Sequence, residues 1–350
     1  MNKDIYDKNL EIDSADLDDS IVFYDVTERP FKLYGNCIEA ENIYARMPEK
    51  IAKKISDGVA DRGGRSAGVR LRFKTDSTRL ALKVSLKKYI QFPAQSAIGT
   101  RGFDVYADGK YCASVIPENG TSNYYEQLTN IGDNREKDIV IYFPYNSEID
   151  NLSVGLDKHS LLGEGDSYAV KEPIVFYGSS ITHGFCVLRP GNVFSAMVSR
   201  KLNADYINMG FSGVCRGEPL MAEYLASIKK SVLVCGYDHN EQSAESLEER
   251  HLPFYKKYRE YDADTPILFV SSPNVICKGI SMYDRMKVVE KTYKYALENG
   301  DDKVYFLNGH TLYPDDIRFD CSADGIHPND LGSYMISEKI CEKLKTILKN

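Results

Sequence analysis

The chain has 350 residues and a net charge of −7, with 43% hydrophobic and 27% charged residues. This composition is typical of a globular protein, and the length exceeds what one domain usually holds, so we expect two domains. The acidic balance and the lack of a Lys/Arg-rich tract disfavour nucleic acid and anionic membranes as partners.

The first twenty residues carry many acids and no apolar core of the length that a secretory signal needs. No other stretch approaches the roughly 20 apolar residues of a transmembrane helix. We therefore expect a cytoplasmic protein. The eight cysteines form no CxxC pair and the six histidines form no HExxH or HxH cluster. This scatter predicts reduced thiols and neither a metal nor another cofactor.

The first half of the chain, up to about residue 165, has the pattern of an all-β sandwich. Polar and apolar residues alternate in several short runs, which is the period of half-buried strands. Asp108-Gly109 lies between two of these runs and is a strong hairpin signal. Short strands with turn signals and little helix indicate a sandwich. The expected strands are 68–73, 80–86, 102–106, 111–115, 138–143 and 152–156.

From Pro173 onward the pattern changes, because short apolar strands alternate with helical segments. Strands are expected at 174–177, 205–208, 232–236, 267–271 and 303–307. Helices are expected near 192–202, 217–229, 243–260, 282–299 and 330–349. This alternation predicts a parallel, three-layer α/β sheet, with its site at the carboxyl ends of the strands. The expected domains are 1–165 and 172–350, joined by a polar linker at 158–171.

The clearest functional signal is an Asp three residues before a His near the C-terminus, Asp324 and His327. Ser180, in the turn after the first α/β strand, is the candidate nucleophile, and Ser179 is its positional rival. A hydroxyl, a His that takes its proton and an Asp that orients the His form a nucleophile–base–orienter set. The structural alternatives are a helix cap at Ser180 and a turn former at Asp324.

Two further segments follow the second and third α/β strands. The glycine-rich turn 208–213 allows close approach of backbone to a ligand, and the N–H groups of Gly213 and Ser180 are candidate oxyanion donors. The alternative is an ordinary tight turn. Asn240 is the candidate third donor, while Asp238 is either structural or a hydrogen-bond acceptor for substrate. His239 is a rival general base without a nearby orienter in sequence.

Two arginines lie close to these segments in sequence. Arg189 is in the loop after Ser180, and Arg216 follows Gly213. Either binds substrate hydroxyl groups or caps a helix, and the sequence does not decide between these roles.

Four segments in this order resemble the SGNH (GDSL-like) hydrolase superfamily. Members of that family use a Ser after the first strand, a Gly and an Asn as oxyanion donors, and an Asp-x-x-His near the C-terminus. Ser179 stands where the family usually has Asp. In the third segment Asp238 stands where the family has Asn, so Asn240 as donor is an inference from chemistry. The four segments are 178–181, 208–213, 236–240 and 324–327.

The resemblance covers roughly residues 173–349 and implies a catalytic set of Ser180, His327 and Asp324, with Ser180, Gly213 and Asn240 forming the oxyanion hole. The β-rich half is similar to the jelly-roll accessory domains of two-domain carbohydrate esterases. These likenesses imply a serine esterase that removes acyl groups, acetyl first, from carbohydrates. The 25 tyrosines fit carbohydrate contact, although the chain has no Trp.

Two alternatives stay open. One is an esterase or acyltransferase that acts on a small metabolite or a lipid ester. The other is a carbohydrate-binding protein without turnover, which Ser180→Ala separates from an enzyme.

We expect activity to fall when acid protonates His327, since the base must be neutral. The oligomeric state is open, with a homo-oligomer among the alternatives.

Overall fold

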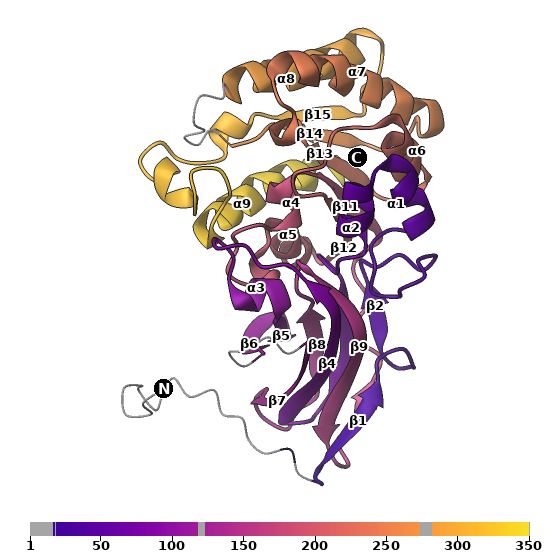
Figure 1. Ribbon diagram of the computed structural model, residues 1–350, viewed down its shortest axis with the longest axis vertical. Coiled ribbons are helices and arrows are strands. Elements are labelled where there is room, and N and C mark those ends of the chain that lie inside the picture. Colours follow the sequence, from indigo (N-terminus) through magenta and orange to yellow (C-terminus); the bar gives the residue numbers. More distant parts are fainter. Residues whose placement is uncertain (1–16, 18, 118–122, 274–281, 350) are drawn as a thin grey trace.

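The computed structural model describes residues 17, 19–117, 123–273 and 282–349. Figure 1 shows two parts, an antiparallel β part and a parallel α/β part stacked along the long axis of the molecule.

Seven cysteines are free thiols, and Cys277 lies outside the described residues. None of the helices within these ranges has the length and apolar character needed to cross a membrane.

The β part consists of two antiparallel sheets that enclose one apolar core. The first sheet has the order β1 (Ile21–Asp25), β9 (Ser147–Asp157), β4 (Arg79–Tyr89) and β7 (Tyr124–Asn130). The second has the order β10 (Leu162–Gly163), β3 (Arg70–Thr75), β8 (Lys137–Tyr142), β5 (Phe103–Ala107) and β6 (Lys110–Val115), with β2 (Lys32–Tyr34) also paired to β3. This arrangement confirms the predicted β-rich fold, while the jelly-roll topology stays a prediction.

The hairpin predicted at Asp108-Gly109 joins β5 and β6. Both residues have positive φ, 50° and 76°, as a two-residue hairpin turn requires. The sequence pattern does not predict three short helices in this half. They are α1 (Glu49–Ile55), α2 (Asp57–Gly63) and α3 (Ala97–Arg101).

The α/β part is a five-stranded parallel sheet with helices on both faces, which confirms the predicted fold class. Its strand order is β12 (Ala204–Gly210), β11 (Val170–Gly178), β13 (Val232–Gly236), β14 (Ile267–Val270) and β15 (Val304–Leu307). In chain order this is 2-1-3-4-5, the flavodoxin-like order. Helices α6 (Pro219–Ser227), α7 (Ala244–Tyr261) and α8 (Met282–Glu298) share one apolar core with the sheet, and α5 (Phe194–Leu202) and α9 (Asp330–Ile347) share the other.

The shorter helical segments lie in the loops of this part. They are α4 (Ser180–His183) and the 3₁₀ turns η3 (Pro190–Asn192), η4 (Asp238–Asn240), η5 (Gly309–Thr311) and η6 (Arg318–Cys321). Strand β11 is flanked by β12 on one side and β13 on the other. The loops that leave these three strands therefore meet at the point where the strand order reverses, which is where ligands bind in open α/β sheets.

Long-range contacts join the two parts. Met47, Ala52 and Val59, from α1, α2 and the segment before them, belong to the same apolar core as residues of α6. The buried Arg70 of β3 forms an ion pair with Asp205 at the start of β12. The first 165 residues thus help to build the α/β part, and the domain division 1–165 and 172–350 stays a prediction.

Candidate active site

The turn after β11 presents Ser180 at the start of α4. Ser179 is the N-cap of this helix, and its Oγ accepts a hydrogen bond from the Ile181 N–H at 3.3 Å. The capping alternative therefore belongs to Ser179, since Ser180 is already the first helical residue. The Ser180 hydroxyl does not cap the helix and points to His327, with its Oγ 2.8 Å from Nε2.

The Asp-x-x-His segment is a tight loop that precedes α9. The Oδ1 atom of Asp324 accepts the backbone N–H groups of Ile326 and His327 at 3.0 and 2.8 Å. Its Oδ2 atom accepts the Nδ1–H of the His327 ring at 2.7 Å. With Nδ1 donating to the carboxylate, Nε2 is left to accept the Ser180 hydroxyl proton. The three-residue spacing therefore sets both the loop and the tautomer.

The electrostatics of this loop favour the ionised carboxylate. Partial burial opposes ionisation of Asp324, but the backbone N–H and imidazole of His327 and the Ile326 N–H outweigh it, so the pKa of Asp324 is lowered. The Cys186 thiol lies 3.9 Å from Asp324 Oδ2, and burial together with that carboxylate raises its pKa to about 12. Cys186 is thus a neutral neighbour of the Asp324 carboxylate.

Among the described residues, Cys186, Asp324 and His327 form a group that could hold a metal ion, since their ligand atoms lie within 4.8 Å of one another. His327 Nδ1 lies 2.7 Å from Asp324 Oδ2, and Nε2 of the same ring lies 2.8 Å from Ser180 Oγ. Both ring nitrogens of His327 are therefore already hydrogen-bonded. The geometry therefore fits the hydrogen-bonded chain better than a metal site.

The loop after β12 lies beside α4 because Gly210 permits it. A Cβ atom at Gly210 would stand 2.2 Å from the backbone nitrogen of His183, too close for any other residue. Asn208 adds two bonds, one from its Nδ2 to Thr182 O at 2.7 Å and one from the Gly210 N–H to its Oδ1 at 2.9 Å. The second sequence segment thus fixes the nucleophile helix against β12.

Gly213 and Asn240 supply the candidate oxyanion donors. Gly213 is exposed and has φ +76°, a conformation that favours glycine. Asn240 Oδ1 accepts the Cys215 N–H at 3.3 Å. Since that bond occupies the carbonyl end of the amide, its two N–H donors have no protein partner among the described residues. The structure therefore brings Asn240 to the loop that carries Gly213.

Arg46 and Arg62 of the β half support this loop, and the sequence analysis missed both. The buried Arg46 donates from Nη1 to the carbonyl oxygens of Asn208 and Gly210, at 2.6 and 3.0 Å. Arg62 donates from Nε to Ser212 O at 3.3 Å. No motif marks these residues, because their partners lie about 150 positions along the chain.

Asp238, which stands where the family pattern has Asn, faces inward. It is 1% exposed, and its two carboxylate oxygens accept the backbone N–H and the hydroxyl of Ser272 at 2.9 and 2.6 Å. Burial raises the pKa of Asp238 despite these bonds. Its contacts tie the end of β13 to the end of β14, which favours the structural alternative.

His239 follows Asp238 and is partly buried. Burial, with His327 and Arg285 nearby, lowers the pKa of His239 to about 4. Its Nδ1 atom has no hydrogen-bond partner among the described residues. Within the described part of the chain, no carboxylate forms a hydrogen bond with this ring, in contrast to His327.

The two arginines of the sequence analysis contact protein side chains. Arg189 donates to Asp104 Oδ2 at 3.1 Å and to Asn192 Oδ1 at 3.0 Å. Arg216 lies 3.9 Å from the buried carboxylate of Glu241. Both guanidinium groups thus have partners in the fold, and a contact with substrate stays a prediction.

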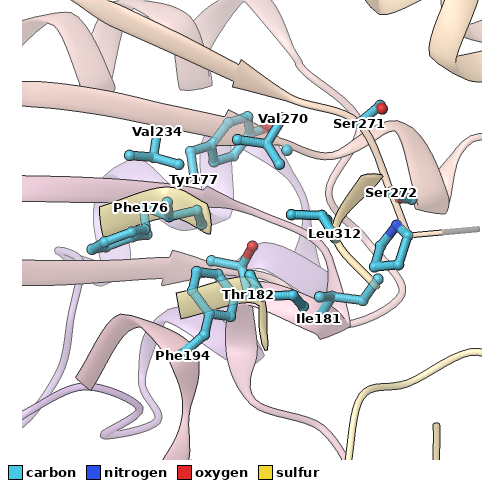
Figure 2. A pocket seen from close by; sticks show the side chains of 14 residues that line it. Phe176, Tyr177, Ile181, Thr182, Phe194, Val234, Val270, Ser271, Ser272 and Leu312 are labelled. Atoms are coloured by element: carbon cyan, nitrogen blue, oxygen red, sulfur yellow. The ribbon is translucent and has the colours of Figure 1, made fainter. Parts of the chain in front are cut away.

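A small cavity lies beneath α4, between β11, β13 and α9. Figure 2 shows Phe176, Val234 and Leu312 among the mainly apolar side chains around it. Its volume is about 30 Å³, room for one or two water molecules. Ile181 and Thr182 line it, but Ser180, Asp324 and His327 do not. We therefore assign it to the packing behind the nucleophile helix.

Two family models match the two halves of the chain. The sequence model of the GDSL-like lipase/acylhydrolase family matches residues 171–345. The chain belongs to this family. A second model, of the N-terminus of SGNH-hydrolase-type esterases, matches residues 21–162. Membership of the GDSL-like family supports an ester-hydrolysing enzyme. No curated protein matches the chain.

Solved structures share the fold over nearly the whole chain. A Bacteroides ovatus protein described as a GDSL-like lipase has a TM-score of 0.85 and 24% identity, covering 94% of this chain and 98% of its own. The salicylyl-acyltransferase SsfX3 of a tetracycline biosynthetic pathway has a TM-score of 0.76 and 19% identity, covering 95% and 98%. The acetyl xylan esterase Est2A from Butyrivibrio proteoclasticus has a TM-score of 0.59 and 12% identity, covering 94% and 99%. At these identities the likeness establishes the two-part fold.

Proposed function

We propose that this protein is a serine esterase that hydrolyses O-acyl esters of carbohydrates, O-acetyl esters first, through an acyl-enzyme. The observation that carries the proposal is the unbroken hydrogen-bonded chain from Ser180 Oγ through the His327 ring to Asp324. It lies at the carboxyl edge of the sheet in a chain of the GDSL-like family.

In the first step Ser180 Oγ forms a bond to the ester carbonyl carbon while its proton passes to His327 Nε2. Asp324 holds Nδ1–H and stabilises the imidazolium. When the tetrahedral intermediate collapses, the bond to the alcohol oxygen breaks and that oxygen takes the proton from Nε2. Water then gives its proton to the same nitrogen and attacks the acyl-enzyme, releasing the acid and free Ser180.

The negative charge of the carbonyl oxygen needs donors on the side opposite His327. The proposal assigns the N–H groups of Ser180 and Gly213 and the Asn240 amide to this role. Two features support it. Ser180 begins a helix, so its N–H is left without an intrahelical acceptor. Asn240 accepts the Cys215 N–H with Oδ1, which leaves its donors available.

Carbohydrate esters are the preferred substrates because several solved structures with this fold are carbohydrate esterases. Similar solved structures include an acetyl xylan esterase and carbohydrate esterases of family two. A second candidate is acyl transfer to an alcohol, since the salicylyl-acyltransferase SsfX3 has the higher TM-score. Both reactions share the acyl-enzyme and differ in whether water or an alcohol accepts the acyl group.

The test is acetate release from acetylated sugars and p-nitrophenyl acetate by wild type, Ser180→Ala and Ser179→Ala. We expect Ser180→Ala to lower kcat by about 10⁴-fold or more. Ser179→Ala should keep turnover and lose roughly 1 kcal/mol of stability, because it removes only a helix cap. Equal rates in wild type and Ser180→Ala would refute the proposal. A product ester formed on adding an alcohol would favour the acyltransferase.

A further inference from the structure

A row of aromatic rings runs from the His327 ring to the β half of the molecule. The Phe185 ring, in the loop after α4, has its centroid 4.4 Å from that of His327. The Phe92 ring, in the loop between β4 and α3, lies 5.3 Å from Phe185. Phe92 is 41% exposed. An aromatic side chain of the β half therefore reaches the rim of the candidate site.

The backbone of the Phe92 loop is well supported. The buried Gln95 side chain accepts the Phe92 N–H at 3.2 Å and the Asn146 amide at 3.0 Å with its Oε1 atom. The Gln95 N–H donates back to Phe92 O at 2.9 Å. The Ser96 hydroxyl donates to Leu188 O, which ties this loop to the segment after α4. The loop backbone is thus fixed beside the site, and the Phe92 ring packs against Phe185, so a ligand that binds there orders little more of the chain.

The reaction geometry determines which part of a substrate lies against the Phe92 ring. This assignment rests on the proposed function. The leaving oxygen must take its proton from His327 Nε2, so the alcohol part of the ester lies on the His327 side. The carbonyl oxygen points to Gly213 and Asn240 on the other side. Phe185 covers the His327 ring, and Phe92 extends the same apolar surface outward. The alcohol part is therefore the part that lies nearest Phe92.

We propose that Phe92 forms a subsite for the leaving alcohol, where its exposed face stacks on the C–H face of a sugar ring. Phe92 stands on an open rim, so a flat ring buries one face against it while its hydroxyl groups stay in water. An alkyl chain would leave most of its length in water at the same place. The β half is then part of the substrate site and selects the alcohol rather than the acyl group.

The experiment compares wild type, Phe92→Ala and Phe92→Tyr on esters that share the acetyl group. The probes are an acetylated methyl glycoside, octyl acetate and ethyl acetate. We expect Phe92→Ala to lower kcat/KM for the glycoside about three- to tenfold, mainly through KM, the size of a ring-stacking contact. Ethyl acetate should change less than about twofold, and Phe92→Tyr should restore the glycoside rate. Tyr261→Ala, at an exposed ring on α7, is the matched control.

The outcomes separate this inference from the proposed function. Equal losses on ethyl acetate and the glycoside would overturn it, as would a loss on octyl acetate alone. The butyrylated form of the same glycoside is the probe for the acyl side, and a larger loss on it than on the acetylated form would also overturn the inference, because Phe92 would then contact the acyl group. Failure of the esterase itself would instead show as Ser180→Ala turning over every ester as fast as wild type.

Discussion

The two sides of the candidate site are built in different ways. On the proton-transfer side, Asp324 and His327 lie three residues apart in one loop, and Ser180, from a distant part of the chain, completes the hydrogen-bonded chain. On the proposed oxyanion side, Gly213 and Asn240 lie on two different loops, which follow β12 and β13. There the support comes from Arg62 of the β half, about 150 residues away. The proton-transfer side thus depends mainly on contacts within one short loop, whereas the oxyanion side depends on contacts between segments that are far apart in the sequence.

The largest expected effect tests the local side. Asp324→Asn should lower kcat by about 10⁴-fold. The amide that replaces Oδ2 would donate to Nδ1, so Nε2 would carry the proton and could no longer accept one from Ser180. Steady-state kinetics on p-nitrophenyl acetate measure this loss. Asp320→Asn, in the neighbouring turn η6, is the control and should keep the wild-type rate.

A smaller effect is expected on the oxyanion side. Asn240→Ala should lower kcat by about 10²- to 10³-fold with little change in KM, because the amide acts on charge that appears only in the transition state. Asn240→Asp should be no better, since a carboxylate would repel the oxyanion. A loss confined to KM, or full activity in either variant, would remove Asn240 from this role.

A still smaller effect tests the support from the β half. Arg62→Ala removes the hydrogen bond from Nε to Ser212 O. One such bond contributes about 1 kcal/mol, so we expect kcat to fall several-fold as the Gly213 loop loses its position. Lys53→Ala, which breaks an exposed ion pair with Glu49 on α1, should change nothing. If both variants behave alike, Arg62 does not support the oxyanion side.

This contrast also explains what the sequence could show. The strand pattern predicted the parallel sheet, and the Asp-x-x-His spacing predicted a contact that the structure contains, because a three-residue loop fixes both side chains locally. Ser180 was a candidate because its segment, 178–182, directly follows an apolar run. These signals depend on short stretches of chain, where periodicity and spacing determine geometry.

The sequence could not show contacts that depend on tertiary packing. Arg46 and Arg62 carry no motif, and their acceptors are backbone carbonyls, which any residue supplies. Helices α1 and α2 are short, and they are stabilised by the apolar core that they share with α6 rather than by a long amphipathic pattern. Asp238 matched the family position by spacing, yet only the fold shows its carboxylate turned to Ser272.

The smallest expected effect concerns the rival base, His239. Burial lowers the pKa of His239 to about 4, so this ring is mostly neutral in the folded protein at mildly acid and neutral pH. His239→Gln should therefore leave the fall of activity between neutral and mildly acid pH unchanged. If that fall disappears in the variant, His239 rather than His327 is the base.

Stability gives His239→Gln a second, independent readout. The pKa of His239 drops from 6.5 to about 4 on folding. Between these two pH values, the ring is therefore mostly protonated in the unfolded chain and mostly neutral in the folded chain. His239 therefore contributes fully to stability above about pH 6.5 and destabilises the fold progressively as the pH falls towards 4. Denaturant titrations should show that His239→Gln loses less stability than wild type over this range. An identical loss would mean that the ring is solvated, and its buried neutral state would then no longer count against it as a base.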